Sequence, residues 1–337
     1  MKTDSASLPY LKWFALPLLV FLAAAIPLNL YFEPLSGDLS RIGYWAERDF
    51  GWSQSQPSVP VRANGAVVER PQVVVLGDSF SHPNVWQSHL ADARHLEILS
   101  YQYRDVGCVD NWVQWVKERH LPDVHTVVIE TVERSFMALF RNRTTCAKRD
   151  PHWHEMAATT LKLSRQQHGL TLDAAYLLQT LGNTVRAALL PGRIVYGGVV
   201  NVPLTTDRLF SNRKANRLLY YSEDDLKMEW TEEDMAAAMQ NLKHIQEELA
   251  ASGLRFVLVV VPDKSTVYRP FMADGAGKAG YPDVFSRLKA ANVNSVDLSE
   301  HFRKEVGNTI DLYLPNDTHL STQGYRLMAA KVANEAF

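Results

Sequence analysis

The chain has 337 residues, with 35 Lys and Arg against 37 Asp and Glu, and a formal net charge of −2 at pH 7. A nucleic-acid binder needs a concentrated positive face, so this balance, without a long basic run, argues against a nucleic-acid partner. The length exceeds the usual scale of ~100–200 residues per domain, and one α/β domain with an insertion accounts for it.

The first predicted element is an apolar segment near the N-terminus. No charged residue lies between Phe14 and Tyr31, and these 18 residues approach the ~20 that a helix needs to span a bilayer. Two lysines precede the segment and two acidic residues follow it, namely Lys2, Lys12, Glu33 and Asp38. The positive-inside rule therefore places the N-terminus in the cytoplasm and the remaining chain outside.

We expect residues 1–32 to form an uncleaved, single-pass membrane anchor. The alternative is a signal peptide that is cut near Ala23-Ala24-Ala25. Residues 33–70 are rich in Ser, Gln, Pro and Gly and read as a linker from the membrane, although three large aromatic residues indicate that part of it packs. These are Trp45, Phe50 and Trp52.

Residues 71–337 predict an α/β domain with a parallel sheet flanked by helices. Five apolar runs without polar alternation indicate strands buried on both faces: Val73–Leu76, Leu96–Leu99, Val127–Glu130, Phe256–Val261 and Asn294–Leu298. Four segments between and after them have helical patterns: Asp110–Arg119, Thr231–Ala251, Pro282–Ala291 and Ser321–Ala336.

A large insertion is expected after the third strand, at about residues 141–230, because so long a connection exceeds a loop of ~2–6 residues. Within it, His154–Gly169 and Leu172–Ala188 look helical, whereas Gly192–Arg208 has no clear pattern.

The candidate chemistry lies at two places far apart in the chain. Gly77-Asp78-Ser79 directly follows the first strand, and Asp317-Thr318-His319 lies near the C-terminus. A serine hydroxyl needs an imidazole to take its proton and a carboxylate to orient that imidazole. In Asp-x-His the carboxylate can reach Nδ1 and leave Nε2 free, so we expect Ser79, His319 and Asp317 to form a catalytic triad.

Several other residues compete for roles near this site. His82 and His89 are alternative bases, of which His89 falls in a predicted helix, and Trp86 and Trp153 are candidates for stacking on sugar rings. Solvated histidines are the better interpretation of His152-Trp153-His154, so no metal site is expected.

Cys108 and Cys146 are the two cysteines of the chain. An exported domain permits a disulfide between them, and two buried thiols are the alternative.

These motifs resemble the first and last blocks of the SGNH (GDSL-type) hydrolase superfamily. Three segments are similar, more narrowly, to proteins that O-acetylate alginate and other bacterial exopolysaccharides: Gly77–Ser81, Glu130–Arg134 and Val261–Tyr268. The chain differs from the alginate-type pattern because its Asp-x-His segment follows the serine segment and because Leu320 replaces a tryptophan. The resemblance implies an SGNH (flavodoxin-like) fold over about residues 70–337.

The same resemblance suggests further site residues. Gly107 matches the glycine that gives a second oxyanion N–H in SGNH enzymes. The third strand ends in Glu130–Arg134 instead of the family's Gly-x-Asn-Asp, so Arg134, held by Glu133, is a candidate for oxyanion or substrate contact, with a structural ion pair as the alternative. Tyr268 and Lys264 are candidates for substrate binding or for a structural role in their loop.

The expected function is that of a periplasmic O-acetyltransferase that carries acetyl on Ser79 and passes it to hydroxyls of an exopolysaccharide. Alternatives are an SGNH carbohydrate esterase that uses water, and a catalytically silent carbohydrate-binding subunit. No cofactor is expected. The resemblance implies that a membrane-bound (MBOAT-type) acyltransferase supplies the acetyl group.

A glycan on Asn316 would lie beside Asp317, which favours the periplasm of a bacterium, with the anchor in the inner membrane.

Overall fold

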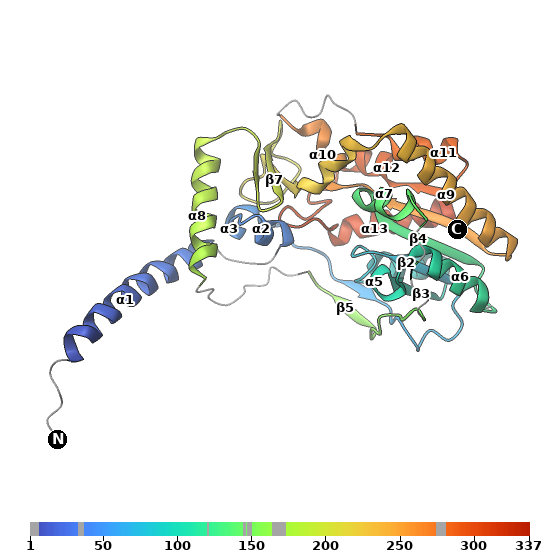
Figure 1. Cartoon of the computed structure of the whole chain (residues 1–337), viewed down its shortest axis with the longest axis horizontal. Helices are drawn as coiled ribbons and strands as arrows, with labels where there is room; N and C mark the ends of the chain where they lie inside the picture. The colour runs from blue at the N-terminus through green and yellow to red at the C-terminus, as the bar shows by residue number, and fades with distance from the viewer. Residues whose placement is uncertain are drawn as a thin grey trace, which may run out of the picture.

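The structure is a computed structural model that describes residues 7–32, 37–119, 121–143, 146, 150–163, 173–273 and 281–337. Figure 1 shows a body built around one sheet, from which the N-terminal helix α1 projects at the end that carries α8.

The central sheet has five parallel strands in the spatial order β10-β9-β4-β2-β3. Their bounds are β2 Val73–Gly77, β3 Ile98–Gln102, β4 Thr126–Val132, β9 Arg255–Val261 and β10 Ser295–Asp297. Read from the β3 edge, the order is 2-1-3-4-5 in chain sequence, which is the flavodoxin-like order. In this order the chain reverses direction across the sheet between β2 and β4, where ligands bind in such folds.

Helices cover both faces of this sheet because successive strand residues point to opposite sides. Val73 and Val75 of β2 belong to the core on one face, and Val74 and Leu76 to the core on the other. The first face is covered by α4 Val85–Arg94, α12 Leu298–Glu305 and α13 Thr322–Ala336, and the second by α6 Val109–Arg119, α7 Phe136–Phe140, α9 Glu232–Ala251 and α11 Val284–Ala290.

All five predicted strands and the four predicted helices of this layer are confirmed, with ends that differ by a few residues. The start of α9 has a local cause. The Thr231 hydroxyl accepts a hydrogen bond from Asp234 N, and the Asp234 carboxylate accepts one from Thr231 N. This reciprocal pair caps the helix.

Residues between β4 and α9 form a separate three-stranded antiparallel sheet beside α8 (Ala174–Leu189). Its strands are β6 Ile194–Tyr196, β7 Val199–Pro203 and β8 Arg217–Tyr221. Gly197 and Gly198, both at positive φ (57° and 77°), make the tight turn between β6 and β7. The stretch Gly192–Arg208, which had no clear sequence pattern, thus contains a hairpin.

The predicted helix over His154–Gly169 is wrong in its described part. Thr159–Leu161 forms strand β5, which pairs with β1 (Val59–Val61), and residues 164–169 lie outside the described residues. The following helix is confirmed as α8, with Asp173 as its N-cap, although Leu172 lies outside the described residues. Pairing with β1 overrides the local pattern because a distant strand supplies the partner.

The segment 37–70 packs on the body at several places, although residues 53–55 and most of 66–70 are exposed. Besides β1 it contains the short helices α2 (Asp38–Ile42) and α3 (Glu47–Phe50). Its aromatic residues Trp45, Phe50 and Trp52 are all buried. The remaining short helices of the described chain are α5 Tyr103–Val106, α10 Lys264–Tyr268, and the 3-10 helices η1 Glu133–Ser135, η2 Ser222–Glu229 and η3 Arg269–Phe271.

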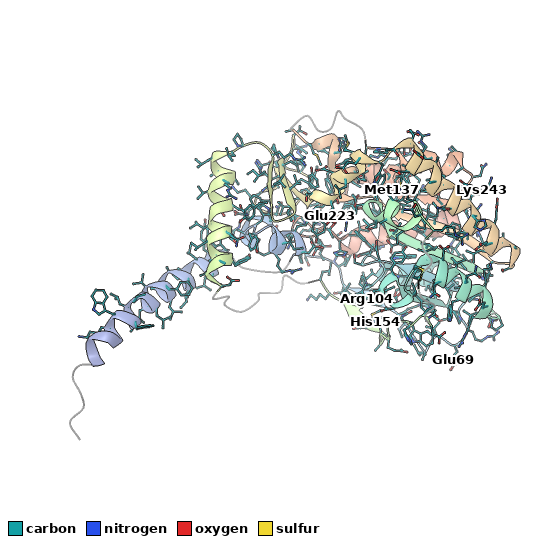
Figure 2. All side chains as sticks on the ribbon, viewed as in Figure 1. Glu69, Arg104, Met137, His154, Glu223 and Lys243 are labelled. Carbon is teal, nitrogen blue, oxygen red and sulfur yellow. A yellow bond between two sulfur atoms is a disulfide. The ribbon has the colours of Figure 1, made fainter. Side chains whose placement is uncertain are left out.

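The N-terminal helix α1 runs over Ser7–Phe32 and is apolar enough to cross a membrane over the 21 residues Lys12–Phe32, with a mean hydropathy of 2.0. The helix projects from the body, so its side chains are exposed on all sides along most of this length (Figure 2). Near its end, however, Ala25 and Phe32 are buried against α3 and α8.

A disulfide joins Cys108 and Cys146, whose Cα atoms lie 6.0 Å apart. It ties the loop between β3 and α6 to the chain beyond α7. The disulfide interpretation of the two cysteines is confirmed, and the interpretation as two buried thiols is wrong.

Candidate active site

Ser79 lies on a turn that begins where β2 ends, at the point where the chain reverses across the sheet. The side chain of Asp78 fixes this turn, because its two carboxylate oxygens accept the N–H groups of Phe80 (2.9 Å) and Val132 (2.7 Å). Val132 is the last residue of β4, so the serine turn is tied to the neighbouring strand.

A second buried carboxyl, Glu130 of β4, holds the same turn from below. Its Oε2 accepts hydrogen bonds from Asp78 N (3.1 Å) and from the Ser81 hydroxyl (2.6 Å). Burial, together with the charge of Asp78, raises the pKa of Glu130 well above its usual value. A Cβ on Gly77 would overlap the Ser81 side chain and lie 2.8 Å from Glu130 Oε2, so this position accommodates only glycine without a shift.

The three residues predicted as a triad meet at this turn. His319 Nε2 lies 2.9 Å from the Ser79 hydroxyl, and His319 Nδ1 lies 2.7 Å from Asp317 Oδ1. The same Asp317 oxygen accepts the backbone N–H of His319 at 2.9 Å. Phe80 packs against the imidazole, with ring centroids 4.9 Å apart. The ring is therefore held on three sides, with Nε2 directed at the hydroxyl.

The electrostatics of this group favour a charged carboxylate beside a basic imidazole. Burial opposes ionisation of Asp317, but hydrogen bonds from His319 and its charge lower the pKa of the carboxyl. Burial also opposes the imidazolium, yet the hydrogen bond and charge of Asp317, with the charges of Asp38 and Asp78, raise the pKa of His319 above its usual value. Ser79 itself is exposed to solvent, so a substrate can reach it.

A residue that sequence reasoning missed also belongs to this cluster. Asp38 of α2 accepts the Thr318 N–H (2.9 Å), and its own N–H donates to Asp317 Oδ2 (3.2 Å). In the sequence, Asp38 had been noted merely as an acidic residue after the apolar segment. No local signal could have revealed it, because its partners lie 279 and 280 positions away.

Lys264 lies buried behind the Asp317–His319 loop. Its Nζ is buried and donates to the carbonyls of Leu314 (2.7 Å), Pro315 (3.0 Å) and Asp317 (3.0 Å). Burial lowers the pKa of Lys264 to about 7, while the charges of Asp317 and Asp38 favour the ammonium. The structural alternative for Lys264 fits this position, and substrate binding does not.

Tyr268 is wrong as a substrate-binding candidate. It is fully buried, stacks on Phe210 with ring centroids 4.7 Å apart, and its hydroxyl accepts the Tyr313 N–H at 3.3 Å. A ring that fills the core of the domain cannot contact a substrate.

Arg134 takes part in a buried ion-pair network. Its guanidinium donates to Asp263 Oδ1 at 2.8 Å and lies 3.6 Å from Asp224 Oδ1. The expectation that Glu133 holds Arg134 is wrong, since Glu133 Oε2 accepts from Lys227 Nζ at 2.9 Å. The side chain of Arg134 remains 14% exposed, and the structural ion pair accounts for its position.

Gly107 lies between α5 and α6, next to Cys108 of the disulfide, with a positive φ of 87°. An exposed backbone at this place is compatible with an oxyanion donor, and that role stays a prediction. Within the part of the chain that the structure describes, the Ser79 N–H donates to no protein acceptor. It is therefore free to bind a developing oxyanion.

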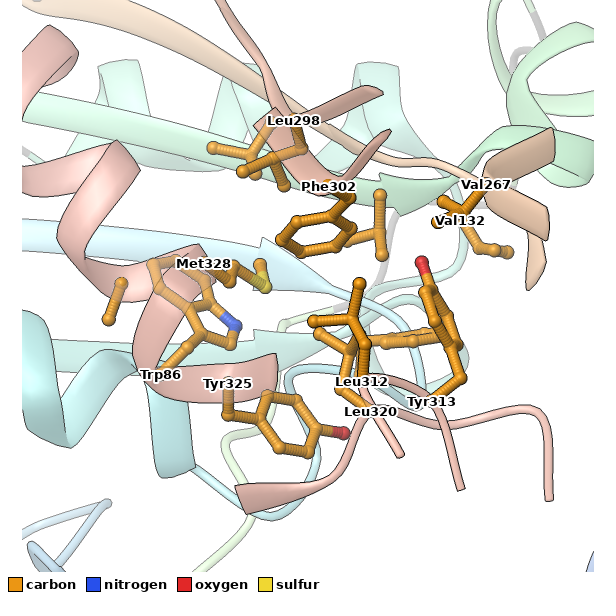
Figure 3. Packing of buried hydrophobic residues seen from close by; sticks show 14 of the residues in the cluster. Trp86, Val132, Val267, Leu298, Phe302, Leu312, Tyr313, Leu320, Tyr325 and Met328 are labelled. Atoms are coloured by element: carbon orange, nitrogen blue, oxygen red, sulfur yellow. The ribbon is translucent and has the colours of Figure 1, made fainter. Parts of the chain in front are cut away.

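The aromatic candidates separate clearly. Trp86 is wrong as a stacking platform, because it is fully buried and packs among core residues that include Tyr325 and Met328 (Figure 3). Its indole N–H donates to the Ser81 hydroxyl at 3.1 Å, so it supports the serine turn from inside. Trp153 is partly exposed, with its ring edge-on to Tyr101.

Of the competing histidines, His89 lies in α4 and is half-buried, while His82 is exposed with its ring 4.9 Å from that of His154. Neither is the base that contacts Ser79.

One group of donor atoms in the described chain is compact enough to suggest a cation. Asp38, Asp317 and His319 each offer an atom within 4.8 Å of the others. Hydrogen bonds within the cluster already engage the carboxylates and Nδ1, as described above, so the group is explained without an ion.

The C-terminal part of the chain matches a known family model. Residues 216–336 match the family model of the SGNH hydrolase-like domain of the acetyltransferase AlgX. This match confirms the resemblance to the SGNH alginate acetyltransferase group. It includes Asp317 and His319, whereas Ser79 lies before it. No curated protein matches the chain. An SGNH hydrolase-like domain of this kind supports an enzyme of the acyltransferase or esterase type.

Proposed function

We propose that the protein is an O-acetyltransferase that moves an acetyl group through an acetyl-serine intermediate onto hydroxyls of a bacterial exopolysaccharide. The observation that carries the proposal is the continuous line of contacts from Asp317 through His319 to the Ser79 hydroxyl. The serine is exposed on a rigid turn, as an attacking group has to be.

In the first half-reaction, His319 Nε2 takes the hydroxyl proton of Ser79 while Oγ bonds to the carbonyl carbon of the acetyl donor. Asp317 accepts from Nδ1–H and stabilises the imidazolium that forms. The Ser79 N–H, and Gly107 N–H as the second donor, bind the oxyanion of the tetrahedral intermediate. The bond from carbon to the donor oxygen then breaks, and that oxygen leaves with the proton from Nε2.

In the second half-reaction, a sugar hydroxyl takes the place of the donor. His319 Nε2 removes its proton, the hydroxyl oxygen bonds to the acetyl carbon, and the bond from that carbon to Ser79 Oγ breaks. The serine regains its proton from Nε2. Water as the acceptor gives the esterase reaction by the same steps, so the acceptor distinguishes the two activities.

We further propose that α1 is an uncleaved anchor in the inner membrane and that the catalytic domain lies in the periplasm. Support comes from the packing of Ala25 and Phe32 against Tyr176 and Leu177 of α8, which makes the end of α1 part of the folded body. Five large aliphatic residues are exposed on and just after α8, the helix that the end of α1 contacts, as expected of a surface near lipid: Leu178, Leu181, Val185, Leu189 and Leu190.

The acetyl donor is proposed to come from a membrane-bound acyltransferase of the MBOAT type. The support is indirect: acetyl-CoA is not available outside the cytoplasm, and a membrane anchor would keep the two proteins together.

The experiment that tests the reaction uses the full chain in detergent micelles with p-nitrophenyl acetate as the donor. Cello-oligosaccharides and uronic-acid oligosaccharides are offered as acceptors, and acetylated sugar is measured by mass spectrometry. Ser79→Ala is expected to abolish both the release of p-nitrophenol and the transfer, whereas Ser295→Ala, at a serine on strand β10, serves as the matched control.

Acetate release without sugar transfer under every condition would favour the esterase. Undiminished p-nitrophenol release by Ser79→Ala would contradict the proposed chemistry. Absence of activity of the unmodified protein in both assays would favour a carbohydrate-binding subunit.

A further inference from the structure

The chain that follows the membrane helix returns at once to the candidate active site. α2 begins at Asp38, six residues after the last residue of α1, Phe32. Two of its backbone N–H groups, from Leu39 and Ser40, donate to the Asn316 carbonyl at 3.1 and 3.2 Å. Gly37 approaches the same carbonyl so closely that a Cβ would overlap it. The juxtamembrane segment, residues 37–47, therefore lies directly on the loop of Asp317 and His319.

A second buried contact fixes the same pair of segments. Asn316 is fully buried, and its Nδ2 donates to Glu47 Oε1 at 2.5 Å, while Glu47 Oε2 accepts from the Ser40 hydroxyl at 2.6 Å. The residue before Asp317 is thus held at both its carbonyl and its side chain. These hydrogen bonds fix the position of the loop relative to α2.

Asp38 is the member of this segment that contacts the Asp317–His319 loop from the side of α2. Its Oδ1 accepts the Thr318 N–H at 2.9 Å, between Asp317 and His319, and its Oδ2 accepts the Tyr221 hydroxyl at 2.9 Å. Its backbone N–H donates to the Asp317 oxygen that His319 does not use, at 3.2 Å. Asp38 thereby holds the second oxygen of the carboxylate that orients the imidazole.

We propose that Asp38 is a positioning residue that holds the Asp317–His319 loop in its active geometry, so that the juxtamembrane segment completes the active site. The inference rests on the proposed function. Asp38 touches neither Ser79 nor a substrate, and it acts through Thr318 and Asp317.

The charge of Asp38 gives this role a signature that a purely structural contact lacks. The groups that face it are Asp317, His319 and Tyr221, and Lys264 lies behind the same loop. Burial, with the nearby charge of Asp317, raises the pKa of Asp38 to about 6. The ionised carboxylate in turn helps to raise the pKa of His319, as do Asp317 and Asp78. Removing this charge lowers the pH at which His319 loses its proton.

The test compares six proteins as full chains in detergent micelles: the unmodified protein, Asp38→Asn, Asp38→Ala, Asp38→Glu, Asp283→Asn and Ser79→Ala. Asp283 is a matched control, because it caps α11 through Ser286 N and lies away from the triad. The readouts are kcat and KM for p-nitrophenyl acetate from pH 5 to 9, with circular dichroism to verify folding.

Asp38→Asn retains the shape of the side chain, so we expect a folded enzyme. Because His319 then loses its proton at lower pH, the acid limb of the plot of kcat against pH is expected to move to lower pH by about one unit. Asp38→Ala frees the loop, and we expect kcat to fall by about 10²-fold with little change in KM. Asp38→Glu is expected to restore part of the kcat that alanine loses. Asp283→Asn is expected to keep the kcat, KM and pH profile of the unmodified protein.

A folded Asp38→Asn variant with an unshifted acid limb, together with unchanged kcat in Asp38→Ala, would overturn the inference. The Ser79→Ala variant distinguishes failure of the positioning role from failure of the proposed function. If Ser79→Ala is inactive and the Asp38 variants behave as the unmodified protein, the triad stands and the positioning role falls.

Discussion

At the scale of single residues, the site depends on buried polar groups that aim exposed ones. Ser79 is exposed and His319 is partly exposed, and each is held from behind by side chains that are themselves buried. Glu130 fixes the serine turn, and Lys264 fixes the loop of the acid and base through three carbonyl acceptors. These buried partners contribute geometry and make no contact with the reacting atoms.

Lys264→Met tests whether a buried side chain that does not touch the reacting atoms holds the Asp317–His319 loop in place. The substitution keeps the aliphatic stem but leaves the carbonyls of Leu314, Pro315 and Asp317 without their donor, so we expect the free energy of unfolding to fall by about 3 kcal/mol. Because these carbonyls shape the Asp317–His319 loop, kcat is also expected to fall, while KM changes little. Urea denaturation and steady-state kinetics measure the two effects.

The matched control is Lys243→Met, at an exposed lysine of α9 that is labelled in Figure 2. Equal stability of the two variants would contradict the assignment of Lys264 as the anchor of the loop.

At the scale of elements, the small antiparallel sheet supports the juxtamembrane segment. The turn between β6 and β7 meets α2 at Gly197, whose missing Cβ makes room for the Ile42 carbonyl. Tyr221 at the end of β8 donates to Asp38 from the same side. The residues between β4 and α9 therefore help to hold the Asp317–His319 loop through α2, although they lie outside the central sheet.

Substitutions at the two turn glycines separate backbone strain from close approach. Both have positive φ, but a Cβ at Gly198 meets nothing within 4 Å, whereas one at Gly197 overlaps Ile42 O. We expect Gly198→Ala to lower the free energy of unfolding by about 1 kcal/mol through strain alone. For Gly197→Ala we expect a further loss of about 1–3 kcal/mol from the overlap, measured by urea denaturation. If the two variants were equally stable, the close contact between Gly197 and the Ile42 carbonyl would make no contribution to the free energy of unfolding.

At the scale of the whole molecule, the apolar helix α1 and the folded body are continuous, because the end of α1 packs into the body. Ala25 and Phe32 are buried against the body, while the preceding part of α1 is exposed. From Phe32 the chain reaches Asp38 within six residues and enters the site. Under the proposed placement, this short connection keeps the catalytic serine close to the membrane surface.

This continuity predicts that the mature protein retains residues 1–32 and resists extraction from membranes by carbonate. Intact-mass measurement of the protein purified from membranes tests the first part. Leu19→Arg places a charge in the middle of the apolar span, which costs about 3 kcal/mol there, and is expected to make the protein extractable. Leu226→Arg, at an exposed leucine outside α1, is the control and is expected to stay membrane-bound. A mature N-terminus near Ala25 would contradict the anchor and identify a signal peptide.

The sequence by itself determined the features that depend on neighbouring residues. Runs such as Val73–Leu76 must be buried on both faces, an apolar stretch of 18 residues can cross a bilayer, and Asp317-x-His319 can make its own carboxylate–imidazole bond. These follow from local pattern and from chemistry within a few positions, and the structure agrees with the strands and with the internal bond of Asp-x-His.

The tertiary structure alone decided which distant groups meet and which residues face solvent. It buried Tyr268, Lys264 and Trp86, which the sequence leaves as candidates for contact with a substrate. It also brought Asp38 across the chain to the loop of the triad. Exposure and long-range contact depend on how helices and strands pack over the whole molecule, and no spacing within one segment carries that information.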